Sequence, residues 1–194
     1  MRKAAIAIVV VGVGALLVIG LVQAGGKDSA STSPPGPLSR AEVSEPLPGA
    51  PAELAALRAR VNEINDGGVK AFDAQLRALR GRPVVVNLWA SWCGPCRFEL
   101  PFFQKQALQR GDEVAFLGVN VGDTEDAARE FAAEFPMPYP SFADPDQKLL
   151  GRFGAQGLPV TAFYDASGEL EFLHQGLYPN EEKLAEAIER YARS

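Results

Sequence analysis

Residues 84–96 read VVVNLWASWCGPC and carry the chain's only two cysteines, Cys93 and Cys96. The first seven residues form a short, largely apolar and β-branched run, which is typical of a strand buried on both faces of a sheet. Pro95 suits the first turn of a helix, where a missing N–H costs nothing, so we expect a helix to begin within residues 93–96. The cysteine pair is therefore predicted to lie where a buried strand passes directly into a helix.

A cysteine pair in this position favours redox chemistry. The thiolate is the attacking species in disulfide exchange, and a helix N-terminus lowers the pKa of a thiol from about 8.5 to near 7 or below. Cys93 should lie at the positive end of the helix dipole, so we predict that it is the nucleophile. Cys96 lies one turn further in, should be more buried, and should resolve the mixed disulfide by attacking Cys93.

Two other roles for the pair are weaker. A structural disulfide that closes only two intervening residues constrains the unfolded chain very little. Two thiolates supply half of a tetrahedral zinc shell, and the chain has no second pair. Copper would need softer or nitrogen ligands, for which His174, Met1 and Met137 are poor candidates, and His174 is interpreted as an ordinary strand residue. We therefore expect no metal and no cofactor, and a non-catalytic copper or metal carrier remains the alternative from a different class.

The composition of the chain bounds its size and excludes one class of partner. It has 194 residues, of which 47% are apolar, enough for about one ordinary domain after a leader. The formal net charge is −5, the pI is near 5.0, and Lys and Arg are scattered, so nucleic acid is not expected as a partner. A single histidine argues against a site built on His ligands.

The N-terminal segment, residues 1–26, has the pattern of an export signal. Arg2 and Lys3 precede an uncharged stretch in which residues 4–22 are all apolar or glycine, close to the roughly 20 residues that span a bilayer. A signal peptide would be cleaved after residues 22–24, whose small final residue suits a peptidase, but its apolar core usually has only about 7–15 residues, so the length favours a retained signal anchor. Basic residues stay in the cytoplasm. We expect a single-pass protein of the cell membrane with an extracytoplasmic catalytic domain, or a secreted or periplasmic protein if the leader is cleaved.

Residues 27–51 are rich in Ser, Pro, Gly and Ala and contain few large apolar side chains. Such a segment cannot bury enough surface to offset its ordering entropy, so we predict a flexible linker. A linker of this kind would let a domain move above a membrane surface. The catalytic domain is then expected to cover residues 52–194.

Apolar periodicity within this domain predicts alternating strands and helices. The alternation, closed by a hairpin and a last helix, predicts an α/β domain with a central mixed sheet flanked by helices. The expected helices are 52–65, a short one through Phe72 to Gly81, one from the cysteine pair to about Arg110, one capped by Asp123 or Thr124, 146–153, and one capped by Asn180. The expected strands after the first are 114–121, 160–164 and 169–174.

Several motifs together resemble the thioredoxin superfamily. Residues 85–96 are similar to its strand and active-site turn, and Pro101 matches the proline that kinks its active-site helix. Residues 157–161 resemble the loop that carries the family's cis-proline, which implies that Pro159 is cis, lies against the dithiol and helps to dock the substrate chain. Trp92 is expected to shield the dithiol and to present a flat apolar contact, the alternative being plain packing.

Finer features resemble the exported TlpA/ResA branch of that superfamily. Glu99 matches a glutamate typical of the branch, and residues 119–135 with 139–144 resemble its extra segment. Asn87 stands where cytoplasmic thioredoxins have a buried aspartate, and an amide cannot take or supply a proton. Glu99 is the only acid within a helical turn of Cys96, so we expect it to handle protons or to contact a partner; the alternative is a solvent-exposed helix carboxylate.

The resemblance covers residues 68–194 and implies a thioredoxin-like fold and an extracytoplasmic thiol:disulfide oxidoreductase that cycles Cys93 and Cys96 between dithiol and disulfide. It implies protein disulfide substrates such as apocytochrome c and a membrane thiol-electron transporter as the reductant. Gly94 and Pro95 match the reducing thioredoxins, which favours a reductase. An oxidase that donates its disulfide to secreted proteins remains the alternative.

Overall fold

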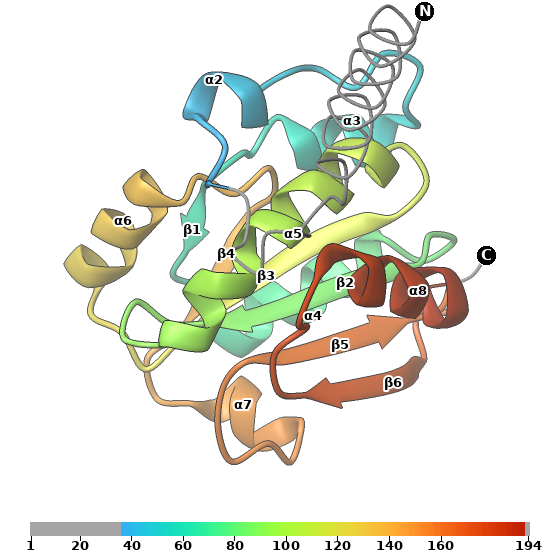
Figure 1. Ribbon diagram of the computed structural model, residues 1–194. Coiled ribbons are helices and arrows are strands. Elements are labelled where there is room, and N and C mark those ends of the chain that lie inside the picture. Colours follow the sequence, from blue (N-terminus) through green and yellow to red (C-terminus); the bar gives the residue numbers. More distant parts are fainter. Residues whose placement is uncertain (1–35, 193–194) are drawn as a thin grey trace, which may run out of the picture. The chain divides into compact units, whose positions relative to one another are not determined.

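The structure, a computed structural model, describes residues 36–192, and within this range six strands form one mixed sheet (Figure 1). The strand order is β1-β4-β3-β2-β5-β6, in which the first four are mutually parallel and β5 is antiparallel to both of its neighbours. The predicted α/β class with a mixed sheet is confirmed. The strands are β1 (Ile64–Asn65), β2 (Val84–Trp89), β3 (Ala115–Val121), β4 (Ser141–Asp144), β5 (Val160–Tyr164) and β6 (Leu170–Gln175).

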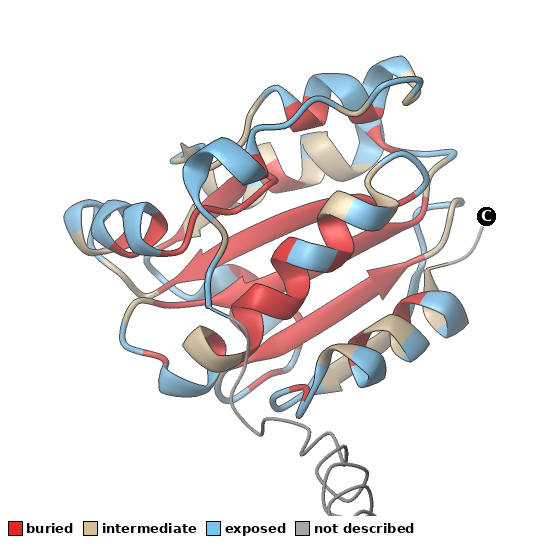
Figure 2. Ribbon diagram, turned by 45° about the horizontal axis from the view of Figure 1, so that its top comes forward, coloured by how far each residue is buried: buried red, intermediate tan, exposed pale blue. Residues whose placement is uncertain are grey.

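Helices cover both faces of this sheet. Helices α5, α6 and α8 contribute to the apolar layer on one face, while α3, α4 and α7 contribute to the layer on the other. Figure 2 shows α5 lying across the buried central strands. The helices of the described range are α2 (Arg40–Val43), α3 (Ala52–Arg58), α4 (Gly68–Ala78), α5 (Gly94–Arg110), α6 (Glu125–Glu134), α7 (Lys148–Arg152) and α8 (Glu181–Tyr191).

The central strands β2 and β3 are buried along their full length, as their apolar runs predict. Each has a neighbouring strand on both edges and helices over both faces, so its sequence does not need to alternate between apolar and polar residues. The predicted hairpin of β5 and β6 is confirmed. Asn180 caps α8 as expected, and Thr124 rather than Asp123 caps α6, because its hydroxyl accepts a hydrogen bond from the N–H of Ala127.

The predicted helix over residues 52–65 is wrong beyond Arg58. The chain turns at Asn62, which has a positive φ of 61°. It then forms the short strand β1, in which Ile64 pairs with Ser141 of β4. The apolar spacing that suggested a continuous helix therefore joins two elements, and neither β1 nor β4 has a run long enough to be recognised from periodicity alone.

The predicted flexible linker, 27–51, is wrong for its second half. Residues 36–51 pack against the domain and include α2, whose capping box pairs Ser39 with Glu42. Val43 at the end of α2 is 0% exposed. One well-placed apolar side chain and a capped helical turn therefore order a segment whose composition suggests disorder.

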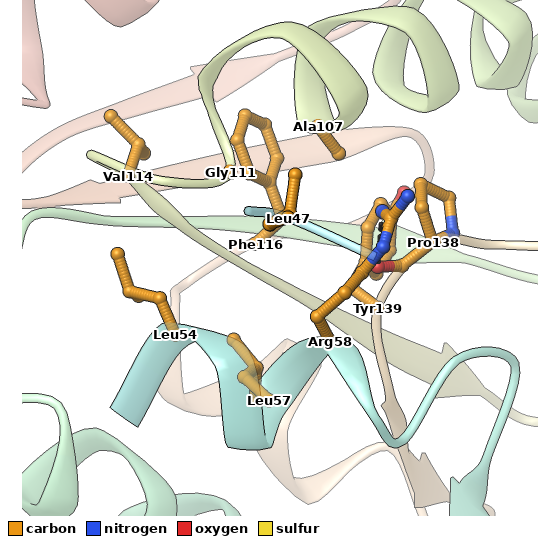
Figure 3. Close-up of a pocket in the computed structure, with 10 residues that line it drawn as sticks. All are labelled: Leu47, Leu54, Leu57, Arg58, Ala107, Gly111, Val114, Phe116, Pro138 and Tyr139. Carbon is orange, nitrogen blue, oxygen red and sulfur yellow. Dashed lines mark hydrogen bonds between the residues drawn. The ribbon is translucent and has the colours of Figure 1, made fainter. Parts of the chain in front are cut away.

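Polar contacts fasten the same segment to the core. The guanidinium of Arg58 donates to the carbonyls of Glu45 and Pro138, at 3.0 and 3.2 Å. The backbone N–H of Leu38 donates to Oε1 of Gln104 on α5, at 2.9 Å. A cavity of about 20 Å³, room for roughly one water, lies beside Arg58 (Figure 3). The segment thus contacts both α3 and the helix that carries the cysteines.

The predicted leader, 1–26, lies outside the described residues. Within residues 36–192, no helix is both long and apolar enough to cross a membrane. The location of the protein therefore stays a prediction.

The burial of Val43 predicts that the 36–51 segment adds to the stability of the domain. Val43→Ala should lower the free energy of unfolding by about 1–3 kcal/mol, because it removes buried methyl groups and leaves a cavity. Urea denaturation of the protein measures this change. Ala41→Ser, at an exposed position of the same helix, is the control and should stay within about 0.5 kcal/mol of the wild type. An equal effect of the two substitutions would contradict the packing of the segment.

Candidate active site

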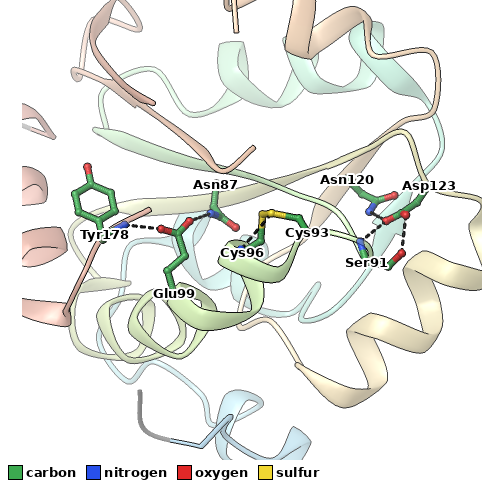
Figure 4. The surroundings of a disulfide bond; sticks show 8 residues. All are labelled: Asn87, Ser91, Cys93, Cys96, Glu99, Asn120, Asp123 and Tyr178. Atoms are coloured by element: carbon green, nitrogen blue, oxygen red, sulfur yellow. Dashed lines mark hydrogen bonds between the residues drawn. A yellow bond between two sulfur atoms is a disulfide. The ribbon is translucent and has the colours of Figure 1, made fainter. Parts of the chain in front are cut away.

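Cys93 and Cys96 form a disulfide at the point where β2 gives way to α5 (Figure 4). Their Cα atoms are 5.3 Å apart. Cys93 is the N-cap of α5, and its Sγ accepts a hydrogen bond from the backbone N–H of Cys96, 3.2 Å away. The helix dipole and the unpaired N–H groups of the first turn stabilise a thiolate at this position, so the geometry suits Cys93 to the nucleophilic role.

Both sulfur-bearing residues are shielded in the oxidised protein. Cys93 is 4% exposed and Cys96 is 1% exposed, so the expected order of exposure holds by a small margin. Gly94 and Pro95 between them are exposed, and a Cβ added at Gly94 would meet no atom within 4 Å. This dipeptide therefore forms the outer surface of the site, where another protein can approach.

Trp92 and the proline loop flank the disulfide. Trp92 is 61% exposed, the most exposed of the large apolar side chains in the described range, which agrees with a flat apolar contact and not with plain packing. The Leu158–Pro159 peptide bond is cis, as the resemblance implies. Val160 pairs with Leu88, so Pro159 lies beside the end of β2 where the cysteine loop begins.

A carboxylate that the sequence analysis considered only as a helix cap holds this loop in place. Asp123 accepts hydrogen bonds from the backbone N–H and the hydroxyl of Ser91, at 2.8 and 2.7 Å (Figure 4). It also accepts one from Nδ2 of Asn120, at 2.6 Å. The sequence feature that could have revealed this role is the position of Asp123 just after β3. Parallel neighbouring strands end at the same edge of a sheet, and Asn120 at the end of β3 pairs with Trp89 at the end of β2.

Glu99 is buried, and the alternative of a solvent-exposed helix carboxylate is wrong. Glu99 is 0% exposed. Its Oε2 accepts a hydrogen bond from the backbone N–H of Tyr178 at 2.8 Å, and its Oε1 accepts a longer one from Nδ2 of Asn87 at 3.5 Å. Glu99 follows Cys96 by three positions on α5, which places the two side chains on one face of the helix. In the view of Figure 4 the Asn87 amide lies between the Glu99 carboxyl and the disulfide.

Burial changes the acidity of this carboxyl. Desolvation raises the pKa of Glu99 to about 8, and the hydrogen bonds from Tyr178 and Asn87 oppose the rise only in part. Burial first, and the Glu99 charge second, also raise the pKa of the phenols of Tyr139 and Tyr178 above their ordinary range. Glu99 can therefore take up or release a proton near neutral pH, while both phenols keep theirs.

The described residues offer little to a metal ion. No group of three His, Cys, Asp or Glu side chains in residues 36–192 is placed to hold one. The two sulfurs are bonded to each other in the disulfide, so they could bind a metal only in the reduced protein.

The sequence matches the model of the AhpC/TSA family over residues 70–173, more than half of the chain. The chain belongs to the AhpC/TSA family. The match includes the cysteine loop, Glu99, Asp123 and the cis-proline loop. It begins after the segment of residues 36–51, so the packing of that segment on the domain lies outside the family match.

Similar proteins carry names that agree with the site. A thiol-disulfide oxidoreductase ResA from Geobacillus kaustophilus is 29% identical over 127 residues, which cover 65% of this chain and 70% of the relative. A thiol:disulfide interchange protein DsbE from Pseudomonas fluorescens is 40% identical over 100 residues, which cover 51% of this chain and 54% of the relative. The chain therefore spans between about half and 70% of the length of these relatives.

Solved structures confirm the predicted fold. MTB dsbF, solved in mixed oxidized and reduced forms, is 30% identical and has a TM-score of 0.55, with 59% of this chain and 84% of that chain covered. The domain thus has a thioredoxin-like fold and is a thiol–disulfide oxidoreductase domain of the ResA/DsbE type with a Cys-x-x-Cys pair. The predicted roles of the individual residues at the site stay predictions.

The raised pKa of Glu99 predicts a distinctive pH dependence of stability. The folded protein keeps a proton on Glu99 up to about pH 8, whereas the unfolded chain releases it near pH 4.5. The folded state binds more protons in this window, so Glu99 makes the free energy of unfolding fall as pH rises from 4.5 to 8. Glu99→Gln cannot ionise and should remove this fall.

Urea denaturation of the oxidised protein between about pH 5 and 9 tests this expectation, because this range covers most of the window between the two pKa values. The stability of Glu99→Gln relative to the wild type should increase across the window by an amount on the order of a few kcal/mol. Glu130→Gln, at an exposed position of α6, should follow the wild type at every pH. A Glu99→Gln curve parallel to the wild type would show that Glu99 does not titrate abnormally.

Proposed function

We propose that this protein is a thiol:disulfide reductase of exported proteins that acts outside the cytoplasm. The observation that carries the proposal is the Glu99 carboxyl, which is buried one helical turn beyond Cys96 and has its pKa raised to about 8. Such a group can exchange a proton with Cys96 near neutral pH, which a dithiol–disulfide cycle requires.

The surroundings of Cys96 agree with the reducing direction. A strong oxidant of this superfamily owes its potential to a stabilised reduced form, which holds a thiolate. Here the apolar surroundings of Cys96 disfavour a second thiolate beside Cys93, so the reduced form gains no stability from that cysteine. The Gly94-Pro95 dipeptide, which resembles that of reducing thioredoxins, agrees with this direction.

In the proposed cycle the Cys93 thiolate attacks a substrate disulfide, forms a mixed disulfide and releases one substrate thiolate. Near neutral pH a minority of Glu99 is ionised, because its pKa is about 8. In that fraction Cys96 transfers its proton to the Glu99 carboxylate, attacks Sγ of Cys93 and releases the second substrate thiolate. Two electrons pass to the substrate, whose two thiolates take up two protons from water. The enzyme ends with the Cys93–Cys96 disulfide and a protonated Glu99, and no cofactor takes part.

The wider context of the proposal comes from the leader and from the family resemblance. The apolar run of residues 4–22 supports a membrane anchor, with the domain on the extracytoplasmic side. That side is usually oxidising, so a reductase there needs a donor, for which we propose a membrane thiol-electron transporter. The proposed substrates are exported proteins with disulfides, such as apocytochrome c, docked against Trp92 and the Pro159 loop.

The order of attack can be tested by trapping. Cys96→Ser should accumulate a mixed disulfide between Cys93 and a protein substrate such as insulin, because the resolving thiol is missing. Cys93→Ser is the matched control and should form none. Non-reducing electrophoresis separates the outcomes, and a mixed disulfide on Cys93→Ser alone would reverse the assigned roles.

The direction of electron flow can be tested by the reduction potential. Potentials in this superfamily run from about −270 mV for thioredoxin to about −120 mV for a strong oxidant, and we expect a value toward the reducing end. Equilibration of the Cys93–Cys96 disulfide with glutathione buffers measures it. A potential above about −150 mV would make the protein an oxidase that donates its disulfide to secreted proteins.

A further inference from the structure

Three polar side chains form a row across the sheet beside Glu99. Asn87 of β2 pairs directly with Thr161 of β5, and Thr161 pairs directly with His174 of β6. Directly opposed residues of antiparallel strands have Cβ atoms about 4.5–5.5 Å apart and point to the same face. That face is the one covered by α5, because Asn87 reaches the Glu99 carboxyl.

Each member of this row has a buried polar atom that meets no hydrogen-bond partner among the described residues. These atoms are Oδ1 of Asn87, Oγ1 of Thr161 and Nε2 of His174. Buried polar groups in proteins are almost always hydrogen-bonded, and ordered water serves those that lack a protein partner. Three such atoms on adjacent strands point to ordered water along the row, which begins at Glu99.

His174 forms the outer end of this row. It lies on β6, the edge strand of the sheet, and is half-buried, with Nε2 directed inward. Its ring stacks on Tyr178, with centroids 4.1 Å apart and planes 23° apart. The backbone N–H of Tyr178 in turn donates to Glu99, so the imidazole and the carboxyl are positioned by the same residue.

We propose that Thr161 and His174, together with ordered water, carry protons between the Glu99 carboxyl and solvent at the β6 edge. An imidazole can accept a proton on one nitrogen and release one from the other, so it can pass a proton without leaving its place. This inference rests on the proposed function, in which Glu99 receives one proton from Cys96 in each turnover. The relay returns that proton to water, and no electrons move along it.

The other titratable groups that face the row do not offer a second route by which the proton could reach solvent. The phenols of Tyr139 and Tyr178 lie near Glu99 and hold their protons, since burial and the Glu99 charge raise their pKa. Tyr191 of α8 lies beside Tyr178. The row thus has the buried Glu99 carboxyl at one end and the His174 imidazole at the edge of the sheet.

Steady-state kinetics can test the relay. His174→Phe keeps an aromatic ring to stack on Tyr178 but removes both nitrogens, and Thr161→Val keeps the shape but removes the hydroxyl. With a peptide disulfide and an excess of a thiol reductant at pH 7 and low buffer concentration, each variant should turn over about tenfold more slowly, because Glu99 must lose its proton before each new cycle. The apparent KM should not change, because Thr161 is fully buried and neither residue belongs to the proposed docking surface of Trp92 and the Pro159 loop.

Two further readouts separate a relay from a structural role. Added imidazole should restore the rate of His174→Phe toward that of the wild type, since a small base can replace the missing group. Thr161→Val should unfold at nearly the wild-type temperature, because the hydroxyl has no hydrogen-bond partner among the described protein residues. The control Tyr164→Phe removes a hydroxyl from the opposite face of β5 and should leave the rate unchanged.

The relay is overturned if both variants react within twofold of the wild type, or if the slow rate of His174→Phe is not restored by imidazole. Should His174→Phe fail to fold, Thr161→Val alone decides the outcome. Glu99→Gln measured in parallel distinguishes a failure of the relay from a failure of the proton role in the proposed function. If Glu99→Gln is fast, the proton role in the proposed function fails; if it is slow while both relay variants are fast, only the relay fails.

Discussion

The pairing of β2 on both of its edges is the constraint on which the site depends. β3 runs parallel along one edge, so its carboxyl end, followed by Asp123, lies at the carboxyl end of β2. β5 runs antiparallel along the other edge, so it begins at that same end, directly after Pro159. The cysteine loop leaves β2 between these two neighbours, and each of them reaches it without a long insertion. One strand arrangement therefore supplies the anchor of the loop on one side and the proline on the other.

The helix that follows β2 closes the face above Asn87 and thereby buries Glu99. A carboxylate that accepts two or three backbone N–H bonds has a lowered pKa, but Glu99 accepts one such bond, from Tyr178, and a second contact of 3.5 Å from an amide. These contacts do not compensate for the loss of water, so the pKa rises to about 8. The same packing that makes α5 a stable platform for Cys93 thus tunes the group beyond Cys96.

Local sequence signals predicted the elements that carry the chemistry but not their surroundings. The run before Cys93, the cap at Asn180 and the hairpin after Pro159 are encoded within a few neighbouring residues, and the structure confirms them. The burial of Glu99 depends on Tyr178, which lies 79 residues away, and no local pattern reveals it. The order of residues 36–51 likewise depends on distant contacts, the hydrogen bonds of Leu38 with Gln104 on α5 and of Glu45 with Arg58 on α3.

Asn87 gains a physical reason from this arrangement. A carboxylate at this position would face that of Glu99, and two acids in contact raise the pKa of one of them and titrate as a coupled pair. The amide instead donates to Glu99 and leaves a single acid in the buried cluster that can change charge near neutral pH. Because Asn87 also pairs with Thr161, it joins this one acid to the polar row that leads to the edge strand. The amide thus fixes how many protons the cluster stores beside Cys96 and the direction in which they can leave.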